Sequence, residues 1–114
     1  MKTVVIAFSH RLMAQSVAHT LSQTGRFRIH ITDPMQEDPA TVCQSLQADV
    51  LLLEGKHHIC KDQKLSCKTV VMCDDNSAPE VLQQVVIEKK LGKIDDFVFF
   101  SISEHYLTAL LSSL

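Results

Sequence analysis

The sequence is poor in the residues that build phosphate-binding loops and membrane spans. It contains only 3 glycines and neither a GxGxxG nor a P-loop pattern, so we do not expect a loop that cradles phosphates. No apolar run approaches the length of a membrane span. The short apolar run at residues 4–7 also lacks the length and the cleavage pattern of a signal peptide. We therefore expect a cytoplasmic chain without a membrane partner.

An excess of one charge is also missing. The 11 basic and 13 acidic residues are interspersed and give a formal net charge of -2. Since no basic patch stands out, we expect no direct contact between this domain and nucleic acid. The four cysteines, Cys43, Cys60, Cys67 and Cys73, form no close CxxC pair, and in a reducing compartment they are read as free thiols. The 46% apolar content and the length of 114 residues predict one domain, 1–114, with one core.

Five short runs predict β-strands. They cover residues 3–7, 26–32, 49–53, 69–73 and 97–100. Most of these runs are continuously apolar, which is typical of strands buried on both faces of a sheet. Residues 26–32 alternate instead, with Phe27, Ile29 and Ile31 on one side, and this alternation predicts a half-buried strand at a sheet edge.

Helical patterns fill the intervals between these strands. The predicted helices cover residues 11–23, a short segment that begins at Asp38 and Pro39, 77–91 and 103–114. Ser77 and Glu80 match a capping box at a helix start. The apolar stripe of that helix comprises Val81, Leu82, Val85 and Val86. Residues 56–66 are weakly periodic and predict a short helix at most. Alternation of strands and helices favours an α/β, doubly wound, mostly parallel sheet, with sites at the carboxyl ends of its strands.

Three segments carry a resemblance to a known family. Residues 6–12, IAFSHRL, are similar to the I-A-D-D-H-x-L opening of receivers that are joined to helix-turn-helix domains. Residues 49–55, DVLLLEG, resemble the D-V-x-L-x-D third strand, and residues 93–100, KIDDFVFF, resemble the G-A-D-x-F-x-x-K fifth strand. The chain thus resembles the receiver domain of two-component response regulators, in the CheY-like superfamily, particularly receivers of LuxR/NarL-type regulators. The resemblance implies a flavodoxin-like, five-stranded parallel sheet with strand order 2-1-3-4-5.

The residues that perform phosphoryl transfer in this family are replaced here. In such a receiver, two acids and an acceptor aspartate hold magnesium, while a hydroxyl and a lysine bind the phosphoryl oxygens. The matching positions are Phe8 and Ser9 for the acids, Glu54 for the acceptor, Cys73 for the hydroxyl (Asp74 if the register shifts by one) and Phe100 for the lysine. Since these residues supply few oxygen ligands for magnesium, the resemblance implies a degenerate phosphorylation site. We therefore expect a domain that binds no cofactor and is not an enzyme.

Other features of the resemblance concern shape and partners. The interval between Glu54 and Cys73 is too short for a full strand-helix-strand crossover, so we expect a shortened third helix or a loop there. Phe97 matches the family's switch aromatic, with core packing as the alternative interpretation. The last two helices and the fifth strand match the family's dimer face, which implies a protein partner or a homodimer. Four apolar side chains of the last helix either pack on the sheet or extend that face: Leu107, Leu110, Leu111 and Leu114.

Glu54 itself has two interpretations. Its carboxylate imitates a phospho-aspartate, with less charge and fewer acceptors, or it is a solvated strand-end residue of a site that has decayed. The favoured function is an atypical receiver in signal transduction or transcription regulation, which acts by protein–protein contact without ordinary aspartyl phosphorylation. A DNA-binding output domain would lie outside this chain.

A second class of function stays open. The chain could be a small flavodoxin-like metal-binding or catalytic domain that uses Glu54, Asp74 and Asp75 at adjacent strand ends. The same alternative applies to a set of zinc-capable residues whose spacing matches no familiar zinc pattern: His57, His58, Cys60 and Cys67. A redox pair of Cys60 with Cys67 is a further possibility, though no flanking motif supports it.

Overall fold

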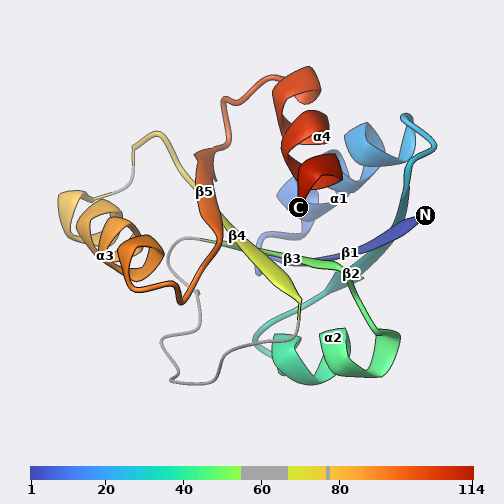
Figure 1. Ribbon diagram of the computed structural model, residues 1–114, viewed down its shortest axis with the longest axis horizontal. Helices are drawn as coiled ribbons and strands as arrows, with labels where there is room; N and C mark the ends of the chain where they lie inside the picture. The colour runs from blue at the N-terminus through green and yellow to red at the C-terminus, as the bar shows by residue number, and fades with distance from the viewer. Residues whose placement is uncertain (55–66, 77) are drawn as a thin grey trace.

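One parallel sheet runs through the middle of the molecule, with helices on both faces (Figure 1). The computed structural model describes residues 1–54, 67–76 and 78–114. Its strands are β1 (Lys2–Ala7), β2 (Phe27–Thr32), β3 (Val50–Glu54), β4 (Lys68–Cys73) and β5 (Asp96–Phe99). They lie in the order β2-β1-β3-β4-β5, and every neighbouring pair is parallel. The predicted fold class and strand order are therefore confirmed.

The described residues form four helices. These are α1 (Arg11–Ser22), α2 (Pro39–Leu46), α3 (Pro79–Lys90) and α4 (Glu104–Ser113). In this described part of the chain no helix is both long and apolar enough to cross a membrane. The segment 56–66, where the sequence predicts a short helix or a loop, lies outside the described residues.

Helix starts follow local sequence signals in three of the four cases. The side chains of His10, Asp38 and Ser103 accept hydrogen bonds from the first backbone N–H groups of α1, α2 and α4. Helix α3 differs, because its N-cap is Ala78, which has no side chain that can cap, and proline occupies the first helical position. The expectation that Ser77 is the N-cap is therefore wrong, and Ser77 itself lies outside the described residues.

The sheet separates two cores, one on each face. Alternate residues of β1, β3 and β4 point to opposite faces, so a continuously apolar strand supplies both cores. The core under α1 and α4 contains Ile6, Phe8, Leu52, Met72, Leu107 and Leu111 among others. The core under α2 and α3 contains Ala7, Cys43, Leu53, Cys73 and Val85 among others. The last-helix leucines therefore belong largely to the core, since Leu110 and Leu114 also pack against it.

Two apolar patterns fit less well than the sequence predicts. On the edge strand β2, Phe27 is buried and Ile29 half-buried, but Ile31 is exposed. On α3, Val85 is buried whereas Val86 is exposed. Helix α3 buries Glu88 in its place, with 1% exposure and a 3.4 Å hydrogen bond from the Gln84 amide. The helix is thus rotated relative to its most apolar stripe.

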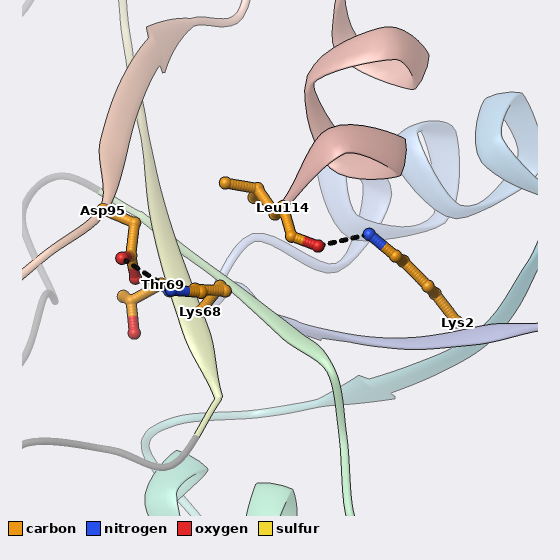
Figure 2. A network of polar contacts seen from close by, with 5 residues as sticks. All are labelled: Lys2, Lys68, Thr69, Asp95 and Leu114. Carbon is orange, nitrogen blue, oxygen red and sulfur yellow. Dashed lines mark hydrogen bonds and ion pairs between the residues drawn. The ribbon is translucent and has the colours of Figure 1, made fainter.

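The amino-terminal ends of the strands are tied together by charged side chains bonded to the backbone. The Lys2 ammonium donates to the carbonyl oxygens of Leu111, Ser112 and Leu114 at the end of α4. Figure 2 shows the contact with Leu114. A cation there satisfies carbonyls that have no helical partner and opposes the negative end of the helix dipole. Carboxylates make the corresponding bonds to N–H groups: Asp49 accepts from Thr3 at 2.8 Å, and Asp95 accepts from Thr69 at 2.7 Å.

Candidate functional site

A pocket of about 470 Å³ opens at the opposite edge, where the strands end. This edge is where open α/β sheets place their ligand sites. The described residues that line the pocket are Ser9, His10, Met13, Glu54, Met72, Asp74, Asn76, Ala78, Val81 and Phe100. They come from the ends of four strands, β1, β3, β4 and β5, and from α1 and α3, and they combine an apolar wall with a few polar groups. The site residues predicted from the sequence meet here only in part.

Glu54 is the buried polar centre of this edge. It is the last residue of β3 and is 5% exposed. Its carboxylate accepts one hydrogen bond from the Ser9 hydroxyl at 2.9 Å and another from the His10 backbone N–H at 3.1 Å. Because His10 is the N-cap of α1, the negative charge lies at the positive end of that helix. The interpretation of Glu54 as a solvated residue is therefore wrong, while its likeness to a phospho-aspartate stays a prediction.

Two aromatic rings occupy the positions that match an acid and the lysine of a receiver. Phe8 follows β1 directly and is 2% exposed, in the core under α1 and α4. Its ring meets the ring of Phe100 edge to face, with centroids 5.8 Å apart and an angle of 84° between the planes. Such a pair contributes about 1 kcal/mol beyond the burial of its area. Neither ring can ligate magnesium or neutralise a phosphoryl group.

Cys73 does not reach the pocket. It is the last residue of β4, and its side chain points into the core under α2 and α3. Burial there raises the pKa of its thiol. Asp74, the next residue, does line the pocket. The alternation of side chains along β4 explains this, because adjacent residues point to opposite sides of the sheet.

The acidic residues after β4 serve the local turn. Asp74 accepts a bond from the Asn76 backbone N–H at 2.9 Å, and Asp75 accepts one from the Ser101 hydroxyl at 3.1 Å. Within residues 1–54, 67–76 and 78–114, no three histidine, cysteine, aspartate or glutamate side chains are grouped so that they could hold a metal ion. Glu54 and Asp74 both line the pocket, and a cation site at these carboxylates stays a prediction.

The candidate zinc and redox residues of the polar segment fall mostly outside the described structure. His57, His58 and Cys60 belong to residues 55–66, which are not described. Cys67 is described, and it is buried in the core under α2 and α3 beside Cys43. The sequence did not predict that Cys43 and Cys67 lie together, because the two residues are far apart along the chain.

Phe97 lies on the other side of the sheet from Phe8. It is half-buried against the core under α2 and α3, and its ring meets Phe99 edge to face with centroids 6.5 Å apart. The Lys89 ammonium lies 5.6 Å from the centre of the Phe97 ring, within the range of a cation–π contact. Phe97 is not among the described residues that line the pocket. Its position fits the interpretation of core packing.

No family model and no curated protein matches this sequence. Several solved structures are similar to it. A LuxR-family DNA-binding response regulator from Staphylococcus aureus is similar with a TM-score of 0.73 and 16% identity, over 99% of this chain and 98% of that chain. The signal receiver domain of the response regulator NarL from Mycobacterium tuberculosis is similar with a TM-score of 0.70 and 14% identity, over 98% of this chain and 94% of that chain. The receiver domain of a modulated diguanylate cyclase from Desulfovibrio desulfuricans is similar with a TM-score of 0.75 and 13% identity, over 99% of this chain and 92% of that chain.

Identities this low establish a shared fold, and the shared fold extends over nearly the whole chain. The strand order and the helices on both faces agree with it. The chain therefore has the CheY-like, flavodoxin-like fold of response regulator receiver domains.

Proposed function

We propose that this chain is an atypical receiver domain that acts in signal transduction by protein–protein contact and does not accept a phosphoryl group in the ordinary way. The observation that carries the proposal is the edge-to-face pair of Phe8 and Phe100, where a working site would hold an acid and a lysine. Two opposite charges of the phosphorylation machinery are replaced by one hydrophobic contact. A receiver could tolerate the loss of one charged group, but two rings packed against each other replace both the magnesium ligand and the cation that binds the phosphoryl group.

The electrostatics of the pocket support the same proposal. A phosphoryl group carries a charge of nearly −2 at neutral pH, and that charge needs cations around it. No lysine or arginine is among the described residues that line the pocket. Ser9, at the second acidic position, donates its hydroxyl to Glu54. We propose accordingly that the domain uses no magnesium or other cofactor and catalyses no reaction.

The surface of α3, β5 and α4 is the proposed contact site for a protein partner or a second copy of the chain. Exposed apolar side chains lie on all three elements: Val86, Ile87 and Leu91, then Phe99, then Tyr106. On α3, a shallow and almost wholly apolar hollow is lined by Leu82, Gln83, Val86 and Ile87. Exposed apolar side chains of this kind are typical of interaction sites when they form a continuous patch.

We also propose a reducing, cytoplasmic location. Cys43, Cys67 and Cys73 are free thiols in the described part of the chain, and free thiols fit a compartment that keeps cysteines reduced.

The first experiment tests phosphoryl acceptance. The chain is incubated with acetyl phosphate and magnesium, and its intact mass is measured. We expect no phosphoryl adduct, either in the wild type or in Glu54→Asp, because the missing acid and lysine are not restored by that change. An adduct that appears in the wild type and disappears in Glu54→Gln would overturn the proposal.

The second experiment tests the contact surface. Ile87 is 49% exposed on α3, and Ile87→Glu places a charge in the centre of the apolar hollow. Leu12→Glu is the control, since Leu12 is also apolar and is even more exposed, at 72%, but lies on α1. Self-association by sedimentation velocity, or capture of a partner, should fall at least tenfold in Ile87→Glu only. An equal loss of association in both variants, or no loss in either, would show that this surface is not the contact site.

A further inference from the structure

Two cysteines that are distant in sequence meet in the core under α2 and α3. Cys43 belongs to α2, and Cys67 directly precedes β4. They are 4% and 8% exposed, and both lie in the same cluster of buried side chains. Each thiol has the largest influence on the pKa of the other, so the two side chains interact within this cluster. The fold therefore brings a pair of reduced thiols together without any CxxC spacing.

The interaction between the thiols makes the two sulfur atoms chemically unequal. It lowers the pKa of Cys67, and together with burial it raises the pKa of Cys43. Among the described residues, the carboxylates of Asp38 near Cys43 and Asp95 near Cys67 oppose ionisation of the pair. Since thiolates and not thiols are nucleophiles, Cys67 is the more reactive partner.

We propose that Cys43 and Cys67 are a redox modification site, at which a peroxide converts the two thiols into an intramolecular disulfide. The Cys67 thiolate attacks one peroxide oxygen, the O–O bond breaks, and a sulfenic acid forms with release of water after protonation. The Cys43 sulfur then attacks the Cys67 sulfur, the S–O bond breaks, and a second water leaves with the remaining thiol proton. Overall, two thiols lose two electrons, and one hydrogen peroxide molecule is reduced to two water molecules.

The disulfide would link two elements, α2 and β4, that flank β3 along the chain. It joins α2 to the start of β4, and the closed stretch of chain contains β3, which ends at Glu54. Oxidation therefore constrains the strand that carries the only carboxylate held at the β1–α1 turn in the described structure. This inference does not rest on the proposed function, because the thiol pair lies on the opposite side of the sheet from the Phe8 and Phe100 rings.

The competing products are distinguishable by mass spectrometry. Cys60 could in principle pair with Cys67, and Cys73 shares the core of the proposed pair. The full chain is reduced, treated with chelator, and exposed to a small excess of hydrogen peroxide at neutral pH. Free thiols are then alkylated with iodoacetamide, and tryptic peptides are mapped.

We expect the number of alkylated cysteines to fall from four to two, with a peptide in which Cys43 is bonded to Cys67. Cys60→Ser and Cys73→Ser should keep this product, and Cys43→Ser should abolish it while its Cys67 sulfenic acid is trapped by dimedone. A bond between Cys60 and Cys67, or four thiols that remain alkylated in the wild type, would overturn the proposal. Because the wild type and Cys60→Ser decide the result, a folding failure of Cys43→Ser would leave the test intact.

Discussion

The two edges of the sheet use charge in opposite ways. At the amino-terminal edge, the charges of Lys2, Asp49 and Asp95 bond to backbone groups and close the ends of strands and of α4 (Figure 2). At the carboxyl edge, where this fold places its chemistry, Phe8 and Phe100 meet as a ring pair. In our proposal, charge supports the backbone at the first edge, and at the second edge two aromatic rings take the place of two charged groups of a receiver.

The strongest way to break this comparison is to return a charge to the carboxyl edge. Phe8→Asp removes a buried ring and places a carboxylate in an apolar core, so we expect it to cost roughly 4 kcal/mol of unfolding free energy. Urea denaturation followed by circular dichroism measures this loss. Phe8→Leu is the control and should cost about half as much or less, because it stays apolar. A Phe8→Asp variant that is as stable as Phe8→Leu would show that this edge still tolerates an acid.

Removal of the buried charge of Glu54 at that edge should have a smaller effect. Glu54→Gln keeps the shape but loses a carboxylate that accepts from Ser9 and from the start of α1, so we expect a loss of about 2 kcal/mol. Chemical denaturation at neutral pH gives the value. The control is Asp74→Asn, an exposed acid of the same pocket, which should change stability by no more than about 0.5 kcal/mol. Similar values for the two variants would mean that Glu54 is not part of the folded framework.

The smallest effect is expected at the amino-terminal edge. Lys2→Met removes a cation from the end of α4, and we expect a loss of about 1 kcal/mol that shrinks as salt is added. Thermal unfolding at low and high ionic strength measures both. Lys68→Met serves as the comparison, since its 3.8 Å pair with Asp95 is largely exposed and should contribute less than about 0.5 kcal/mol. If Lys68→Met proved as costly as Lys2→Met, bonds to backbone carbonyls would not explain the stability of this edge.

The fold was predictable from the sequence because the apolar strands carry a strong and local signal. Residues of β1, β3 and β4 are apolar on both sides, and only a covered central strand accommodates that pattern. The rotation of α3, which buries Glu88 and exposes Val86, was not predictable, because it depends on how the helix lies on a sheet assembled from distant segments. Local periodicity says which face is apolar but not which face is covered.

The site was predictable in position but not in detail. The carboxyl ends of the strands indicated the right edge, and simple alternation along β4 would have shown that Cys73 and Asp74 point to opposite sides. The burial of Glu54 had no local signal, since its partners lie in a turn that is distant in sequence. The contact of Cys43 with Cys67 is tertiary for the same reason.

The most direct test of the central claim is two-dimensional NMR of the labelled chain with magnesium and beryllofluoride, which imitates a phosphoryl group. A receiver with intact acids and lysine is titrated in parallel as the positive control. Our account predicts that the control responds and that this chain shows no shifts around Glu54, because the rings of Phe8 and Phe100 supply neither a ligand for the metal nor a cation for the anion. Saturable shifts that begin at Glu54 and extend to Phe97 would contradict it, and would mean that the carboxyl edge still works as a phosphorylation site.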